Sequence, residues 1–528
     1  MKPAPLHPAQ LEVIRQATAA VAEEMKFDLM RTARSPVLRE AGDLSCALTD
    51  ALGRTVAQGN DIPMHLGVLS FTVQRLLEVV PAEQLRPGDV FFTNLPACGG
   101  NHLPDVKAVR PIHVDGALSA FAVALAHWPD VGGALPGSYV PQAREIYEEG
   151  LVIPPIRLFC TDGPCEAALR LVLANVRGAE QRRGDIQAQV ATTGIAEERL
   201  GEIFAAHGRE TVLTAWRRMQ AESEERVRRA LRALPDGTYR GEDALDDDGI
   251  AEGPVVIRVE LTVENDRAVF DFRESDPRAA GPVNTTPFIA AAAVAYTIRA
   301  VLDPEVDSNH GLLAPVEILT AEGSLLDPGP DAPLVAGNHE TSQRIVDALL
   351  VAFAQVAPDR VVAAGMGSSG LALFSARASD GRDLFLYETH AGGAGAGAAR
   401  DGDSATRIHM SNVMNTPVEV IETEYPLRVE RHELRDGSGG AGRRQGGDGM
   451  RRAYRVLADE ARLTTVIERC RVPPRGLQGG DEGAMSAVWL VRDGERRALR
   501  GKGSVELRRG DLVIVETAGG GGYGAPES

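Results

Sequence analysis

The N-terminal segment from Pro8 to Thr32 has apolar residues at the spacing of one face of an α-helix. These residues are Leu11, Ile14, Ala17, Val21, Met25 and Leu29. The pattern predicts an amphipathic helix at the start of the fold. Residues 45–58 form two short strand-like runs around Asp50-Ala51-Leu52-Gly53, which predicts a hairpin. Further strand-like runs at 90–92 and 121–125 are broken by Gly and Pro turns.

Helical and strand-like patterns alternate along the rest of the chain. Residues 187–233 have a charged helical pattern that ends at the breaker Leu234-Pro235-Asp236-Gly237. Paired strands are predicted at 255–263 and 267–272, and helices at 290–302 and 341–357, the first of which is almost entirely apolar. Beyond Ile421, short β-type segments such as 487–491 and 511–515 dominate.

These patterns predict a multi-domain protein of mixed α and β (α+β) class with a β-rich C-terminal region. The breaker at 234–237 and the change beyond Ile421 divide the chain into three expected regions. They are an N-terminal α/β region (1–235) with the candidate site, a central α+β region (236–420) and a C-terminal β-rich region (421–528). The order of the strands does not follow from the pattern.

The charge and composition exclude several classes of function. The formal net charge is −18 and no Lys/Arg cluster is sustained, so binding to nucleic acid is not expected. Because no apolar run is long enough to span a bilayer and no signal sequence is evident, we expect a cytoplasmic protein without a membrane partner. The odd number of scattered cysteines, five, suits a reducing compartment.

Glycine-rich segments at 392–397, 437–442 and 519–522 raise the question of nucleotide binding. None ends in the Lys-Ser/Thr of a P-loop, and none links a clear strand to a helix. A role in positive φ angles and close backbone approach is therefore favoured over a phosphate cradle. ATP, if used, is expected on another chain.

Two histidines stand in short segments bounded by Gly or Pro. His102 lies in Gly99-Gly100-Asn101-His102-Leu103-Pro104-Asp105, and His127 in Ala126-His127-Trp128-Pro129-Asp130. Imidazoles and carboxylates on tight turns are suited to a hydrolytic metal centre that keeps a position open for water. Alternatively, each histidine is an ordinary loop residue satisfied by hydrogen bonds. Because each is followed three residues later by an aspartate, the pair favours a metal site.

Seven segments of the chain form a recognisable set. They are residues 43–48, 62–67, 99–105, 126–133, 337–344, 415–419 and 436–443. This set resembles the hydantoinase B family, also described as the hydantoinase B/oxoprolinase family. Its relatives include the second half of 5-oxoprolinase, caprolactamase subunits and the large subunits of acetone and acetophenone carboxylases. The resemblance extends over most of the chain.

The resemblance implies a metal centre built from Asp43, His102, Asp105 and His127. Asp43 rests on the resemblance, because spacing does not select it among the 74 acidic residues. Its alternative role is to end the loop before the following strand. Two oxygen and two nitrogen donors suit a divalent metal, Mn or Zn, with Fe as a third candidate.

Asp130, Glu40 and His65 are the candidate catalytic residues around this centre. Asp130 and Glu40 lie three residues from His127 and Asp43, where either carboxylate is a candidate to hydrogen-bond a ligating group. The alternative for both is a solvated surface acid. His65 follows a proline-containing turn and is a candidate to polarise substrate or carry a proton, or else a structural histidine bonded to the backbone.

One stretch departs from the family pattern. Relatives commonly carry Asn-Asp-Pro-Tyr before the first histidine motif, whereas this chain has Asn94-Leu95-Pro96-Ala97. Leu95 and Ala97 replace the acid and the aromatic residue. If the acid positions substrate or assists proton transfer, the substrate or the catalytic strength differs here.

The function implied by the resemblance is the metal-assisted opening of a cyclic amide such as a hydantoin or a lactam. A hydantoinase A-type partner, expected to bind ATP-Mg in an actin-like site, would phosphorylate the amide oxygen before water attacks at this subunit's metal. A hetero-oligomer is therefore expected. The alternatives are a subunit of an acetone/acetophenone-type carboxylase, less favoured by the chain length, and a non-catalytic structural subunit.

Overall fold

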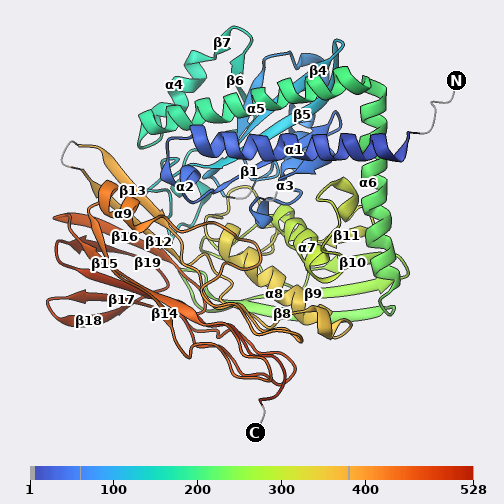
Figure 1. The fold of residues 1–528 in the computed structure, drawn as a ribbon. Helices are drawn as coiled ribbons and strands as arrows, with labels where there is room; N and C mark the ends of the chain where they lie inside the picture. Colours follow the sequence, from blue (N-terminus) through green and yellow to red (C-terminus); the bar gives the residue numbers. More distant parts are fainter. Residues whose placement is uncertain (1–5, 60, 101, 379–380, 527–528) are drawn as a thin grey trace.

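The computed structural model describes residues 6–59, 61–100, 102–378 and 381–526. Its first layer is a seven-stranded sheet in the order β2-β1-β5-β4-β3-β6-β7 (Figure 1). The strands are β1 (Leu44–Asp50), β2 (Thr55–Gln58), β3 (Val90–Thr93), β4 (Asp105–Val114), β5 (Ala117–His127), β6 (Ile156–Cys160) and β7 (Gly163–Pro164). The hairpin expected at 45–58 is thus confirmed as β1 and β2.

Helices cover both faces of this sheet because its central strands are apolar on both sides. On β5, the alanines from Ala120 to Ala126 belong to the core under α1 and α5, whereas Phe121, Val123 and Leu125 belong to the core under α3. The small alanine side chains leave room for the two long helices, which lie side by side in Figure 1. The helices of this region are α1 (Pro8–Thr32), α2 (Pro36–Arg39), α3 (Val68–Val79), α4 (Glu166–Ala174) and α5 (Ala179–His207).

Helix α6 (Arg209–Arg232) leads to a second sheet in the order β11-β10-β9-β8. Its strands are β8 (Gly237–Asp247), β9 (Glu252–Glu264), β10 (Arg267–Asp271) and β11 (Val316–Leu319). Helix α7 (Pro287–Val301) is buried along most of its length, as its apolar sequence predicts. Helix α8 (Ser342–Phe353) packs on β8 and ends before the predicted limit of residue 357.

The C-terminal region contains two further sheets, in the orders β13-β12-β16-β19 and β14-β15-β20-β17-β18. The first combines strands from both sides of residue 421. Short helix α9 (Val418–Glu424) precedes the second. The strands are β12 (Leu371–Arg377), β13 (Asp383–Glu388), β14 (Leu427–Arg435), β15 (Gly449–Val456), β16 (Glu460–Val466), β17 (Ala487–Arg492), β18 (Glu495–Leu499), β19 (Lys502–Arg508) and β20 (Leu512–Glu516).

Most predicted elements are confirmed, and the multi-domain α+β class holds. The helical pattern at 187–233 is divided by Gly208, which has a φ of 82° and separates α5 from α6. Strand β4 was not evident from alternation, because polar Lys107 and Arg110 lie within it and are buried. No helix in the described residues is long and apolar enough to cross a membrane.

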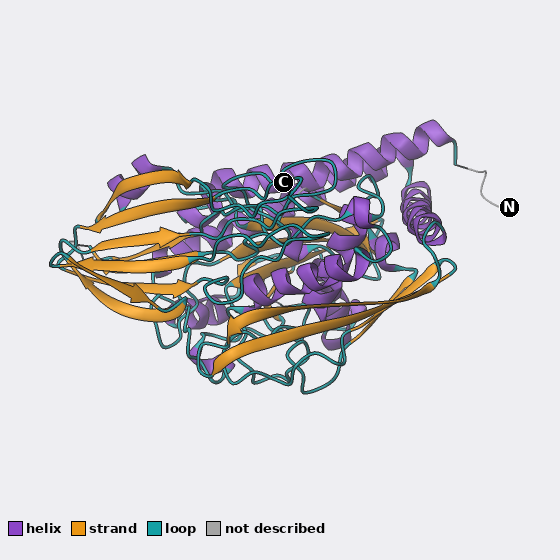
Figure 2. Cartoon of the chain, turned by 90° about the horizontal axis from the view of Figure 1, so that it is seen from below, coloured by secondary structure: helices purple, strands orange, loops and turns teal. Residues whose placement is uncertain are grey.

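Glycine-rich loops pack against one another near the C-terminus, where loops gather at one end of the C-terminal strands in Figure 2. We call residues 391–397, 438–447, 475–484 and 518–524 the glycine layer. Gly520 donates to the carbonyl of Gly447 at 2.8 Å, and Gly447 donates to that of Ala394 at 2.9 Å. A Cβ on Gly520 would lie 1.8 Å from the Ala394 oxygen. The expected close backbone approach is thus confirmed at these glycines.

Candidate metal centre

The order of three strands places three of the predicted ligands side by side. Because β5 lies between β1 and β4, Asp105 at the start of β4 is directly opposite His127 at the end of β5. Asp43 immediately precedes β1, and its carbonyl accepts the His127 backbone N–H at 3.1 Å. The three side chains therefore emerge at one end of adjacent strands.

His102 reaches this row from a tight loop. Gly99 has a φ of 64°, and a Cβ there would lie 2.6 Å from the Thr72 backbone nitrogen, so this position requires glycine. Asn101 of the same motif lies outside the described residues. Beyond it, the Nε2 of His102 lies 3.1 Å from the Oδ1 of Asp105.

The four predicted ligands are thus brought together. The Nδ1 of His127 lies 3.2 Å from the same Asp105 oxygen and 3.9 Å from the Oδ2 of Asp43. One ligand atom each from His102, Asp105 and His127 lies within 4.8 Å of the others, and all three residues are about 1% exposed. We call Asp43, His102, Asp105 and His127 the metal-site cluster.

His65 joins the metal-site cluster from the side. It ends the 3₁₀ turn η1 (Pro63–His65), and its Nε2 lies 3.3 Å from the Oδ2 of Asp105. Its Nδ1 lies 2.8 Å from the hydroxyl of Ser45. The Asp105 carboxylate is therefore shared by three imidazoles. The His65 ring contacts this carboxylate and Ser45, so it orients Asp105 and does not bind the backbone.

Asp130 and Glu40 are not brought to the metal-site cluster. The Asp130 carboxylate accepts hydrogen bonds from the backbone of Gly132, Gly137 and Arg177, and it pairs with the Arg177 guanidinium at 3.0 Å. This arrangement fixes the loop that leads to Tyr139. Glu40 pairs with its neighbour Arg39 at 2.9 Å on a half-buried surface.

Four other side chains enclose the metal-site cluster and were not selected by sequence reasoning. The rings of Tyr139 and Tyr387 pack on His127, and their hydroxyls are 3.1 Å apart. The Asn338 amide nitrogen lies 3.3 Å from the Nε2 of His102, and the His339 ring packs edge-on against His102. Asn338 and His339 lie within segment 337–344, one of the seven segments that resemble the family, and this was the sequence signal that could have pointed to them. No such segment contains Tyr139.

Burial and neighbouring charges shift the pKa values of the two carboxylates of the metal-site cluster in opposite directions. Burial acts to raise the pKa of Asp105, but His102, His127 and His65 outweigh it and hold that pKa well below the ordinary value. For Asp43, burial dominates over nearby His127 and raises the pKa. Burial together with the neighbouring phenol raises the pKa of Tyr139 well above its usual range, so this hydroxyl remains a hydrogen-bond donor at neutral pH.

The donor set fits a divalent cation. Two imidazoles and two carboxylates match the ligands that Zn and Mn take in proteins. A cation between them would also favour ionised Asp43, whose charge is otherwise penalised by burial. Within the described part of the chain, the buried Nε2 of His127 and Oδ1 of Asn338 have no hydrogen-bond partner. Unpaired buried polar atoms of this kind are typical of a site that binds an ion or a ligand.

The stretch with Leu95 and Ala97 borders a separate groove. Both residues line an open groove of about 740 Å³ together with Phe288 and Leu334. Leu334 precedes Val335, whose carbonyl lies 3.2 Å from the Nδ1 of His102. The substitution therefore changes a surface next to the loop of His102 and leaves the metal-site cluster intact.

Comparison with known proteins identifies relatives along the whole chain. The family model described as hydantoinase B/oxoprolinase matches residues 7–526. The caprolactamase subunit beta of Pseudomonas jessenii is 30% identical over 98% of this chain and 91% of its own length. An uncharacterized protein of Methanocaldococcus jannaschii is 34% identical over 98% of this chain and 90% of its length. The 5-oxoprolinase 1 of Arabidopsis thaliana is 33% identical, and this chain covers 42% of it.

Two solved structures share the fold of this chain. The ATP-dependent caprolactamase from Pseudomonas jessenii superposes with a TM-score of 0.92 at 28% identity, covering 99% of this chain and 92% of that one. An acetone carboxylase chain has a TM-score of 0.90 at 17% identity over 98% of this chain and 76% of its own, and shares the fold. With the family model matching nearly every residue, this chain belongs to the hydantoinase B/oxoprolinase family.

Proposed function

We propose that this chain is the metal-dependent subunit of an ATP-dependent cyclic amidase that opens a hydantoin or lactam ring. The observation that carries the proposal is the convergence of the metal-site cluster, whose four residues come from three strand ends and one loop. The relationship to caprolactamase subunit beta over nearly its full length supports a cyclic amide as the substrate class. The reaction is a hydrolysis of the ring C–N bond.

Asp43, His102, Asp105 and His127 would hold a divalent ion, Mn or Zn, with Fe as a third candidate. Such an ion supplies Lewis-acid activation of water, whose pKa it lowers to about 7. His65 and Asp105 orient each other at 3.3 Å, which fixes the carboxylate that the histidines share. The phenols of Tyr139 and Tyr387 and the buried surroundings limit access of bulk water to this space.

A partner subunit completes the proposal. Resonance makes an amide carbonyl a poor electrophile, so phosphorylation of its oxygen by ATP addresses a barrier that water activation does not. The sequence of this chain has no P-loop, and its glycine-rich loops pack on one another. A hydantoinase A-type chain would therefore bind ATP-Mg, in a hetero-oligomer with this subunit. One related protein is itself named as a subunit.

The test is ATP-dependent ring opening by the co-expressed pair. Hydantoin, 5-oxoproline and caprolactam are supplied with ATP and Mn²⁺ or Zn²⁺, and the ring-opened acid is measured by mass spectrometry. We expect turnover that disappears in His102→Ala and persists in His409→Gln, a buried histidine paired with Asp347 outside the metal-site cluster. Unchanged turnover in His102→Ala would eliminate the proposed role of the cluster. Product formation that requires bicarbonate would instead assign a carboxylase.

A further inference from the structure

Three consecutive polar residues beside the metal-site cluster have unpaired buried atoms. Asn338, His339 and Glu340 lie on the π-helical turn η5 (Gly337–Thr341) and are all buried. Among the described residues, the Oδ1 of Asn338, the Nε2 of His339 and the Oε2 of Glu340 have no hydrogen-bond partner. A π-helical turn is uncommon and occurs frequently at functional sites. Gly337 permits the turn, because a Cβ there would lie 1.7 Å from the Asn284 oxygen.

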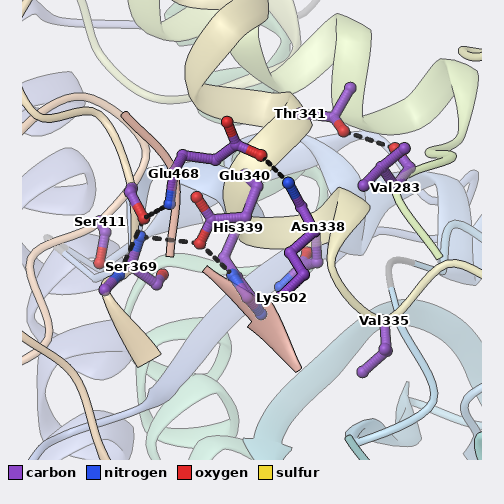
Figure 3. A network of polar contacts seen from close by, with 12 residues as sticks. Val283, Val335, Asn338, His339, Glu340, Thr341, Ser369, Ser411, Glu468 and Lys502 are labelled. Atoms are coloured by element: carbon purple, nitrogen blue, oxygen red, sulfur yellow. Dashed lines mark hydrogen bonds and ion pairs between the residues drawn. The ribbon is translucent and has the colours of Figure 1, made fainter. Parts of the chain in front are cut away.

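Glu340 fixes the orientation of the His339 ring. The Nδ1 of His339 lies 2.9 Å from the Oε1 of Glu340, and the backbone N–H of Ser369 donates to the same oxygen at 3.1 Å. Figure 3 shows these side chains beside the ion pair of Glu468 with Lys502. Burial raises the pKa of Glu340 to about 8, so this carboxyl carries a proton at neutral pH. With that proton on the unpartnered Oε2, Oε1 accepts from both Ser369 and His339, and Nδ1 carries the ring hydrogen. The lone pair of His339 is therefore on Nε2.

The His339 ring is placed beside the metal-site cluster without being part of it. Its centroid is 6.1 Å from that of His102 and 5.5 Å from that of Tyr139. His339 does not join the three residues whose ligand atoms lie within 4.8 Å of one another. A histidine that is buried, oriented by a carboxylate and unpaired at Nε2 thus lies directly against His102 and beside the other predicted ligands.

We propose that His339 is a catalytic residue whose Nε2 accepts a hydrogen bond from the attacking water, with Glu340 as the residue that positions its ring. This inference rests on the proposed function and names a residue of the same site. Accepting this hydrogen bond directs an oxygen lone pair of the water toward the amide carbon. Precise orientation of a nucleophile contributes strongly to rate, since small displacements cost about 100-fold.

The first experiment measures binding and does not depend on turnover. Acetohydroxamate, whose N–H remains a donor to Nε2 although its hydroxyl is deprotonated, is titrated calorimetrically into the Mn²⁺-loaded full chain, and Mn²⁺ affinity is measured separately. His339→Ala should weaken hydroxamate binding by about tenfold, the loss of one hydrogen bond, with Mn²⁺ affinity unchanged. His339→Gln should recover part of the loss, and His409→Gln should match wild type.

Equal hydroxamate affinity in wild type and His339→Ala, or no hydroxamate binding by wild type, would overturn the inference. A large loss of Mn²⁺ affinity would overturn it as well, because His339 would then be a ligand. The second experiment uses ring opening by the complex with its partner. In His339→Ala, kcat should fall about 100-fold with KM little changed, and added imidazole should restore part of the rate.

The two proposals can fail separately. If wild type opens no ring, the proposed amidase function fails, and the hydroxamate titration alone decides the role of His339. If wild type is active and His339→Ala retains its kcat, the inference fails while the amidase function stands. His339→Ala and His409→Gln can both lower the melting temperature. If only His339→Ala loses kcat, the loss reflects catalysis and not reduced stability.

Discussion

Asp105 contacts three histidines because of its place in the sheet. It begins β4 opposite the last residue of β5, so His127 is its cross-strand neighbour, while His102 lies one tight turn before it. A carboxylate shared in this way remains ionised, as its lowered pKa indicates. Removal of any one imidazole would leave the cluster with fewer donors for a cation and with a less compensated buried charge.

The proposed metal-binding role of His102 can be measured directly. His102→Ala removes one of two imidazole nitrogens, and we expect the affinity for Mn²⁺ or Zn²⁺ to fall by more than about 100-fold. Competition with a chromophoric chelator measures this affinity. Asp130→Asn is the matched control, because Asp130 binds Arg177 and the backbone of a neighbouring loop. That variant should lose stability and keep its affinity; equal affinities in His102→Ala and wild type would contradict the assignment.

Glu149 makes stability depend on pH in a specific direction. Burial raises its pKa to about 8, although its Oε1 accepts from the backbone of Val335 at 2.9 Å and of Leu334 at 2.8 Å. Between pH 4.5 and 8 the folded chain therefore holds a proton that the unfolded chain releases, so the free energy of unfolding falls as pH rises through this range.

Glu149→Gln should remove that contribution while its amide oxygen keeps both backbone contacts. We expect the variant to be about 4 kcal/mol more stable than wild type at pH 8.5 and within about 1 kcal/mol of it at pH 5. Urea denaturation at both pH values checks this. Parallel pH profiles of the two proteins would show that Glu149 is not buried as described.

Individual site residues were predictable to different degrees. His102, Asp105 and His127 stand in Gly- and Pro-bounded segments with a recognisable spacing, and Asp43 and His65 were available through family resemblance. The structure brings all five together. Tyr139 and Tyr387 carried no such signal, since tertiary packing brings a loop and strand β13, far apart in sequence, together at the site. His339 lies in the resembling segment 337–344, but its place beside His102 depends on the same packing. The proximity of Asp130 to His127 in sequence was not informative, because the chain turns between them.

Among the elements, the glycine layer is the feature least tolerant of change. Its segments contact one another through main-chain atoms, and a side chain at many of its glycines would overlap a carbonyl oxygen. The sequence indicated close backbone approach at these positions. It did not indicate that four distant segments would share one set of hydrogen bonds, since that depends on the strand order of both C-terminal sheets.

Gly520→Ala tests this packing. The new Cβ would lie 1.8 Å from the Ala394 oxygen, so the backbone must shift, and we expect a loss of at least about 3 kcal/mol of unfolding free energy or failure to fold. Gly201→Ala is the control, since it lies in α5 with no atom within 4 Å of the added Cβ. That change should stabilise the chain by up to about 1 kcal/mol. Similar melting temperatures for Gly520→Ala and wild type would contradict the described layer.

Across the whole molecule, buried ion pairs join regions that the sequence presented as separate. Arg469, between β16 and β17, contacts Asp243 of β8 and Asp347 of α8 at 2.9 Å each. One hydrophobic core also extends from α1 through β12 to Val466 of β16. The α+β class and most elements were predictable from periodicity, whereas the pairing of β12 with β16 across residue 421 was not, because local patterns carry no information on distant partners.

Arg469→Met should therefore destabilise the whole chain. It leaves two buried carboxylates without this partner, and we expect a loss of about 3–5 kcal/mol with a single unfolding transition. Calorimetry and circular dichroism measure both. Arg509→Met, which breaks an exposed pair with Asp459, should leave the melting temperature unchanged. Two separate transitions in wild type would show that the regions unfold independently.

The position of residues 518–524 within the glycine layer has a consequence for biosynthesis. A ribosome releases these residues after every other segment of the layer, yet their amides and carbonyls bond to residues near 394, 440, 447 and 481. The main-chain groups of the three earlier segments therefore remain exposed to water until residues 518–524 have been synthesised. In nascent chains halted before residue 518, we expect the N-terminal sheet to resist protease. The glycine-rich segments 391–397, 438–447 and 475–484 should be cleaved.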